Sequence, residues 1–180
     1  MKISVILPVS NNEKFAERAI ISILNQNYKD FEILICLNGN TSKFNYKLIK
    51  KFNKIKKIKF YKIKEKNIVD ALNFLINKSR GKFIARMDAD DISAPDRLKE
   101  QIKFLEKNKE SFLSTNAEVI DENLDKIYDH KFKNKKKFFT NPIIHPSIMV
   151  NSSILKKTMY RHIPFAEDYD LYFRLENKGI

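Results

Sequence analysis

Apolar residues in the first half of the chain follow two alternating kinds of spacing. Continuous apolar runs predict buried strands at residues 3–9, 31–37, 57–63 and 82–87. Between these runs, apolar residues recur with helical spacing and predict helices at residues 13–26, 42–54 and 67–79. Strands that alternate with helices form right-handed βαβ units, so we expect an α/β fold with a mostly parallel central sheet and flanking helices.

The second half of the chain has a less regular pattern. Ser93, followed by Pro95 and Asp96, is typical of a helix N-terminus, and this helix is predicted to continue to Asn108. Further strands are predicted at residues 111–120, 127–132 and 146–150. A last helix is predicted at residues 167–179, with Gly179 at its C-terminal end.

Four aspartates are crowded directly after the fourth predicted strand: Asp88, Asp90, Asp91 and Asp96. In α/β sheets ligands bind beyond the carboxyl ends of the strands, where the loops after the first two strands also converge. Asp88 and Asp90 are two apart in extended chain, so both carboxylates face one side and suit a hard cation such as Mg²⁺ or Mn²⁺. Turn and helix-cap chemistry is the alternative, and it explains Asp96 and Asp91 but not Asp88.

The composition is typical of one soluble domain. A chain of 180 residues with 43% hydrophobic residues can bury a core. No run approaches the roughly 18 apolar residues of a membrane helix. The apolar N-terminal run is broken at Pro8, which indicates a strand rather than a signal peptide. Cys36 is the single cysteine, which argues against a disulfide framework or a cysteine zinc site, and we expect a cytoplasmic protein.

Positive charge is concentrated in two segments of the chain. The net charge is +13, and residues 47–66 hold ten lysines and one glutamate, while residues 131–137 hold five lysines. Such segments could meet nucleic acid, anionic lipid or a phosphorylated substrate, although most lysine runs are simply solvated surface. Because both segments are basic through lysine and not arginine, the better reader of base edges, we expect no specific nucleic-acid partner.

Several signatures of other enzyme classes are absent from the sequence. The glycines, Gly39, Gly81 and Gly179, cannot form a P-loop or a dinucleotide-binding fingerprint, and no G-x-S-x-G elbow occurs. A nucleotidyltransferase would show a glycine-rich basic signature near the first strand, where the chain has "PVSNNEKF". These absences argue against dehydrogenases, P-loop enzymes, α/β-hydrolases and nucleotidyltransferases.

Four ordered blocks of the sequence resemble glycosyltransferase family 2, which has the GT-A fold. They read "SVILPVSNNEKFAERAIISILNQNYKDFEILI", "ALNFLINKSRGKFIARMDADDISAPDRLKEQIKFLE", "NPIIHPSIMVNSSIL" and "FAEDYDLYFRL". The resemblance implies one Rossmann-like GT-A domain over residues 1–180, with a nucleotide-sugar-binding half at 1–93 and an acceptor-side half at 94–180 that ends early. It also implies inverting transfer of a sugar from a nucleotide-diphosphate donor to a hydroxyl of a cell-surface glycan or lipid-linked acceptor.

The resemblance assigns roles to several of the polar residues. Asp88 and Asp90 match the DxD motif, whose Mn²⁺ or Mg²⁺ bridges the donor diphosphate. Asp168 matches the catalytic base that takes the proton of the acceptor hydroxyl, and a helix N-terminal role is the alternative for this acid. Glu167 and His145 are expected on the acceptor side, and His145 could instead contact a donor phosphate or serve only as a loop hydrogen-bonding residue.

The resemblance places donor binding at Pro8, Ser10, Glu13, Asn38 and Asp88. Ser10 replaces the family's usual tyrosine, and Leu37 and Asn38 replace an acidic pair, so an uncharged amide would meet the nucleobase. These departures leave open an inactive homologue that acts as a binding module, and the lysine runs leave open nucleic-acid binding. For the active enzyme we expect peripheral contact with an anionic membrane at its inner face.

Overall fold

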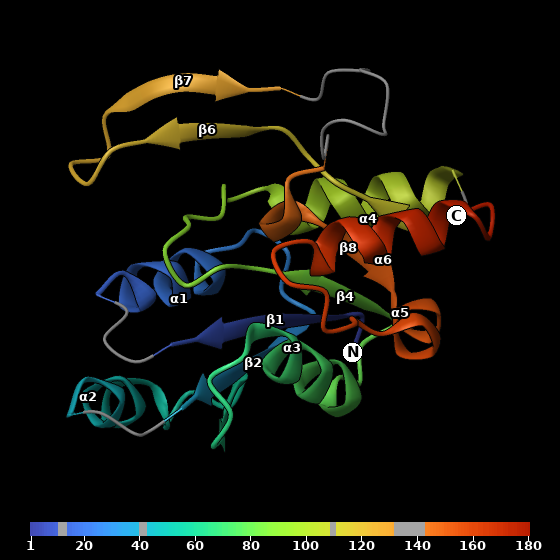
Figure 1. The fold of residues 1–180 in the computed structure, drawn as a ribbon. Coiled ribbons are helices and arrows are strands. Elements are labelled where there is room, and N and C mark those ends of the chain that lie inside the picture. The colour runs from blue at the N-terminus through green and yellow to red at the C-terminus, as the bar shows by residue number, and fades with distance from the viewer. Residues whose placement is uncertain (11–13, 40–42, 109–110, 132–142) are drawn as a thin grey trace.

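The computed structural model describes residues 1–10, 14–39, 43–108, 111–131 and 143–180. At the centre of the molecule is a six-stranded sheet with the strand order β3-β2-β1-β4-β8-β5 (Figure 1). Its parallel strands are β1 (Ile3–Val9), β2 (Phe31–Asn38), β3 (Ile58–Ile63) and β4 (Phe83–Arg86). β8 (Met149–Asn151) runs antiparallel to β4 and pairs with the short strand β5 (Phe112–Leu113). The predicted α/β fold with a mostly parallel sheet is confirmed.

Helices cover both faces of the central sheet. One core contains α1 (Ala16–Leu24), α2 (Lys43–Phe52) and α4 (Arg97–Asn108), and the other contains α3 (Ile68–Lys78), α5 (Ser152–Thr158) and α6 (Glu167–Glu176). Successive residues of a strand point to opposite faces, so Val5 and Leu7 of β1 join the first core and Ile6 joins the second. Because both faces are buried, the parallel strands read as continuous apolar runs in the sequence.

The carboxyl ends of β1, β2 and β4 meet at one edge of the sheet. Ile6 of β1 pairs with Leu34 of β2 on one side and with Arg86 of β4 on the other. At the opposite edge, Gly81 precedes β4, and a Cβ atom on this residue would lie 2.5 Å from the backbone nitrogen of Ser4. Only glycine fits there, so β4 can pack closely against β1 and deliver the aspartate loop to the edge where β1 and β2 end.

The start of α4 differs from the prediction. The helix begins at Arg97, and Ser93 is not its N-cap. Instead, the backbone N–H of Ser93 donates to Ser22 Oγ at 2.9 Å, and Gln26 Nε2 donates to Ser93 Oγ at 3.2 Å. These contacts with α1 hold the segment before the helix against the first core. Asp96 still flanks the helix, where its carboxylate accepts a hydrogen bond from Asn27 Nδ2 at 2.8 Å.

The predicted strand at residues 111–120 is divided between two sheets. Its first part is β5, and its second part, β6 (Ala117–Ile120), pairs antiparallel with β7 (Lys126–His130) in a separate two-stranded sheet. Thr115 separates the two parts, because its backbone N–H donates to Ser147 Oγ at 3.0 Å and its carbonyl accepts from the same hydroxyl at 3.2 Å. Figure 1 shows this pair, named here the β6–β7 hairpin, apart from the central sheet on the side of α1 and α4.

The C-terminal elements also depart from the predicted boundaries. The strand predicted at residues 146–150 is a 3₁₀ turn (His145–Ser147) followed by β8, and α5, which was not predicted, follows directly with Asn151 as its N-cap. α6 ends at Glu176, so Gly179, with φ of 73°, lies in the turn beyond it. Among the described residues, no helix combines the length and apolar character needed to cross a membrane.

Candidate active site

The acidic cluster directly after β4 can hold a divalent cation. Asp88, Asp90 and Asp91 each offer one carboxylate oxygen, and these oxygens all lie within 4.8 Å of one another. Burial, together with the charges of Asp88 and Asp90, raises the pKa of Asp91 to about 6. Neighbouring carboxylates repel one another, and a divalent cation bound between them would relieve this repulsion. Carboxylate oxygens are also ligands that Mg²⁺ and Mn²⁺ prefer.

A buried arginine holds the first acid of the cluster. Arg86, the last residue of β4, is 2% exposed, and its Nη1 donates to Asp88 Oδ2 at 2.6 Å. Burial lowers the pKa of Arg86, but the charge and hydrogen bond of Asp88 outweigh that effect, and the net shift is upward. Sequence reasoning missed this residue because it interpreted residues 82–87 only as a strand. The available signal was a charged residue at the end of an apolar run.

The expected donor-binding residues lie at the ends of β1 and β2. Pro8 pairs with Cys36 inside the sheet, and Ser10 is exposed just after β1. Asn38 is the last residue of β2 and is 7% exposed, and its Nδ2 donates to the carbonyl of Lys66 at 3.2 Å. Its Oδ1 is buried and has no hydrogen-bond partner among the residues that the structure describes. Asn38 is therefore held in place at the end of β2, and its contact with a donor stays a prediction.

One of the predicted donor residues, Glu13, lies outside the described ranges. The roles of the other donor residues stay predictions. What the structure adds is their common location, since Pro8, Ser10 and Asn38 lie at the sheet edge from which the acidic cluster also emerges.

The predicted base, Asp168, lies at the start of the last helix of the chain. Glu167 and Asp168 occupy the first turn of α6, where the helix dipole favours a carboxylate. Burial raises the pKa values of Tyr160 and Tyr172, and the charges of both Asp168 and Asp88 add to this rise. Asp168 and Asp88 therefore lie near the same two tyrosines, although 80 residues separate them in the sequence.

His145 lies in a buried aromatic cluster with Tyr160 and Tyr172. Its Nε2 is 2.7 Å from the Tyr160 hydroxyl, and its ring centroid is 5.4 Å from that of Tyr160 and 6.1 Å from that of Tyr172. Burial and the nearby charge of Arg86 lower the pKa of His145 to about 2, so the imidazole is neutral. The geometry gives His145 a partner inside the protein, and its contact with donor phosphate or acceptor stays a prediction.

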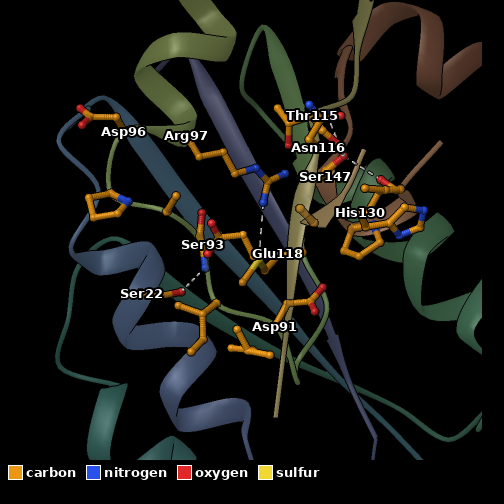
Figure 2. Close-up of a pocket in the computed structure, with 18 of the residues that line it drawn as sticks. Ser22, Asp91, Ser93, Asp96, Arg97, Thr115, Asn116, Glu118, His130 and Ser147 are labelled. Carbon is orange, nitrogen blue, oxygen red and sulfur yellow. Dashed lines mark hydrogen bonds between the residues drawn. The ribbon is translucent and has the colours of Figure 1, made fainter. Parts of the chain in front are cut away.

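A groove of about 1680 Å³ extends from the acidic cluster beneath the β6–β7 hairpin. Asp90 and Asp91 line it, together with Phe15 just before α1, Phe104 of α4 and Val119 of the hairpin. Figure 2 shows Asp91, from the segment after β4, and Arg97 of α4 among the lining residues, together with Glu118 and His130 of the hairpin. The ion pair between Lys14 and Glu122, at 2.9 Å, connects the hairpin turn to the segment before α1.

A family model described as "Glycosyl transferase family 2" matches residues 4–164 of the chain. The chain belongs to glycosyltransferase family 2. This match covers both the acidic cluster and most of the second half, which agrees with the resemblance of the four sequence blocks.

Curated members of glycosyltransferase family 2 are similar over nearly the whole chain. The O-antigen biosynthesis glycosyltransferase WbnJ of Escherichia coli is 35% identical over 98% of this chain and 72% of its own length. The uncharacterized glycosyltransferase MJ1057 of Methanocaldococcus jannaschii is 37% identical over 96% of this chain and 63% of its own length. The chain thus spans roughly two thirds of these relatives.

Solved glycosyltransferase structures share the fold. TarS 1–349 of S. aureus in complex with UDP-GlcNAc superposes with a TM-score of 0.77 at 18% identity, over 95% of this chain and 52% of that one. The mannosyltransferase PcManGT of Pyrobaculum calidifontis, in complex with GDP-Man and Mn²⁺, gives a TM-score of 0.75 at 17% identity, over 97% and 51%. The predicted GT-A fold is therefore confirmed for this family 2 chain.

Proposed function

We propose that the protein is a metal-dependent inverting glycosyltransferase that moves a sugar from a nucleotide-diphosphate donor to a hydroxyl of a cell-surface glycan or lipid-linked acceptor. The observation that supports this proposal is the cluster of three carboxylates directly after β4, the first of which, Asp88, influences the same two tyrosines, Tyr160 and Tyr172, as Asp168 does. In this proposal residues 1–93 bind the donor and residues 94–180 form the acceptor side.

Donor binding is supported by the chemistry of the sheet edge. Asp88, Asp90 and Asp91 would hold Mn²⁺ or Mg²⁺. When bound, the cation supplies positive charge that stabilises the departing nucleoside diphosphate. Asn38 Oδ1 would accept a hydrogen bond from an N–H group of the nucleobase, because its Nδ2 already donates to Lys66. Two structures with a similar fold contain bound UDP-GlcNAc or GDP-Man, which fits a nucleotide-sugar donor.

The sugar transfer itself needs one proton acceptor from the protein. Asp168 takes the proton of the acceptor hydroxyl while that oxygen forms a bond to the anomeric carbon. The bond from that carbon to the donor phosphate breaks on the opposite side, and the nucleoside diphosphate leaves with the electron pair, so the configuration is inverted. Glu167 beside Asp168 orients the acceptor.

The proposed acceptor class is based on the name of one relative, and the proposed location at the membrane is based on surface charge. The name of the relative WbnJ refers to O-antigen biosynthesis, which supports a cell-surface polysaccharide. Lys47, Lys50 and Lys54 of the first basic segment are exposed, and they suit contact with the inner, anionic face of the cell membrane. Equal binding to liposomes with and without anionic lipid at low salt would remove that membrane step from the proposal.

The first test is thermal stability of the protein with a panel of nucleoside diphosphates, with and without Mn²⁺. A ligand at about 100 times its dissociation constant adds about 2.7 kcal/mol to the free energy of unfolding. We expect a rise in Tm that needs both Mn²⁺ and one nucleotide and that disappears in Asp90→Asn. A protein that melts cooperatively but responds to no nucleotide would favour the inactive homologue.

A further inference from the structure

We propose that Arg86 is a positioning residue that fixes Asp88 for cation binding, and this inference rests on the metal dependence proposed above. Its guanidinium binds Oδ2 of Asp88 and so orients Oδ1 of the same carboxylate for the cation. Asp90 and Asp91 then supply the other protein oxygens. Arg86 acts through Asp88 and touches neither the cation nor the donor.

The location of Arg86 makes its pairing with Asp88 necessary. Its side chain is 3% exposed, and moving a charged group into such an environment costs several kcal/mol unless the charge is paired. Among the described residues, Asp88 is the one carboxylate within ion-pair distance of Arg86. Nε of Arg86 is buried and has no partner in the described part of the chain, so the contact with Asp88 is the main compensation for burial.

The backbone of Arg86 is held from both sides, so the guanidinium has a fixed origin. Its N–H donates to the carbonyl of Ile148 in the neighbouring turn at 3.0 Å. Its carbonyl accepts from Nη2 of Arg97 at 2.8 Å, and Arg97 Nε donates to Gln101 Oε1 at 3.1 Å. A residue fixed in this way can orient a flexible carboxylate two positions further along the chain.

The aromatic cluster lies near the same guanidinium and does not neutralise it. Tyr160, Tyr172 and His145 all interact electrostatically with Arg86, and none of them carries a negative charge at neutral pH. No rival carboxylate therefore competes with Asp88 for Arg86 within the described residues. The orientation of Asp88 is set from inside the protein before any ligand arrives.

The two possible roles of Arg86, as a nearby positive charge or as a residue that positions Asp88, predict opposite changes in Mn²⁺ affinity when Arg86 is replaced. If the guanidinium acted only through its charge, Arg86→Met would remove a repulsive cation from the site and would tighten Mn²⁺ binding. If it positions Asp88, the same change frees the carboxylate and weakens binding. Loss of a residue that orients a metal ligand lowers metal affinity about ten- to a hundredfold. We expect that loss in Arg86→Met and a smaller loss in Arg86→Lys, which keeps the charge without the planar fork.

The measurement is Mn²⁺ uptake by the purified protein, followed from the electron paramagnetic resonance signal of free Mn²⁺. It needs neither donor nor acceptor. Glu32→Gln is the matched control, because Glu32 is also buried and ion-paired, with Lys59 at 2.8 Å, but lies near the opposite end of the sheet. We expect this control to lower Tm and to leave Mn²⁺ affinity unchanged.

The outcomes separate the inference from the proposed function. If Arg86→Met fails to fold, Arg86→Lys carries the test alone. Affinity at or above the wild-type value in the folded Arg86 variants would overturn the positioning role only. A wild-type protein that takes up no Mn²⁺ would overturn the metal dependence and the inference together.

Discussion

The Nε2 atom of His145 lies 2.7 Å from the hydroxyl oxygen of Tyr160, and this contact joins the turn before β8 to the segment before α6. Tyr160 is fixed in turn by α3, because Asn73 accepts from its backbone N–H at 2.9 Å and donates to its carbonyl at 3.0 Å. Three segments that are distant in the sequence are therefore held together at Tyr160, whose pKa the charge of the predicted base Asp168 also raises.

The burial of His145 predicts a pH dependence of stability. The pKa of His145 is about 2 in the folded protein and near 6.5 when unfolded, so the unfolded state alone gains a proton below pH 6.5. This loss of stability should approach about 1.4 kcal/mol per pH unit as pH falls. His145→Gln removes the titration, so the stability advantage of the wild type should shrink by roughly 2 kcal/mol between pH 7 and pH 5.

The measurement is chemical denaturation of both proteins across that range. Asp91 titrates nearby with the opposite sign, and the difference between wild type and variant cancels its contribution. If the difference in unfolding free energy between the two proteins stayed constant from pH 7 to pH 5, His145 would bind a proton as readily in the folded state as in the unfolded state.

Asp91 is expected to lower the stability of the metal-free protein at neutral pH. Its pKa of about 6 lies above the usual value, so the folded state binds a proton more readily than the unfolded state. The penalty is present above pH 6 and is relieved as pH falls. With allowance for solvent screening, Asp91→Asn should add on the order of 1 kcal/mol at pH 7.5 and nothing near pH 4.

This comparison is made by thermal melts in a chelator. Added Mn²⁺ should reverse the order of stability, because the wild type then gains a carboxylate ligand that the variant lacks. An Asp91→Asn protein that gains as much from Mn²⁺ as the wild type would show that Asp91 takes no part in cation binding.

Replacement of the predicted base should affect turnover and not donor binding. Asp168→Asn keeps the shape of the side chain and removes its basicity, so we expect kcat to fall by about 10²–10⁴ with nucleotide affinity unchanged. Asp170→Asn is the control, because Asp170 lies on the same helix and pairs with Arg174 at 2.7 Å. That variant should lose stability and keep most of its turnover per folded molecule.

The backbone conformation at Phe165 is expected to lower the stability of the protein relative to a variant with glycine at this position. Its φ is 60°, in the left-handed region, and its side chain is fully exposed just before α6. Because a left-handed conformation costs a residue with a Cβ atom roughly 1–2 kcal/mol, Phe165→Gly should raise the free energy of unfolding by about 1 kcal/mol. Phe165→Ala keeps the Cβ atom and should leave Tm near the wild-type value. Equal effects of both variants would mean that the backbone is not strained there.

The parts of the fold that could be predicted depend on local patterns. The strands β1 to β4 and the helices α1 to α3 were found nearly at their bounds, since each buries residues with its own period. The acidic cluster was found because Asp88 and Asp90 follow a buried strand in an α/β chain. The base at Asp168 came only from resemblance, because nothing in the local sequence distinguishes it from a helix N-terminal acid.

The elements that were missed depend on partners distant in the sequence. The hydroxyl of Ser147 ends the continuous strand predicted at residues 111–120, and Ser22 delays the start of α4. Arg86 was not recognised because its role depends on its ion pair with Asp88 and on its burial, and both arise only in the folded protein.

The sequence by itself determined which segments are strands or helices and where negative charge gathers, because hydrophobic period and charge are properties of neighbouring residues. Only the tertiary structure decided that Asp168 and Asp88 both act on Tyr160, that His145 is neutral and that Arg86 is buried with one acid among the described residues. Those features depend on desolvation and on distances across the sheet, and neither is set until the chain has packed.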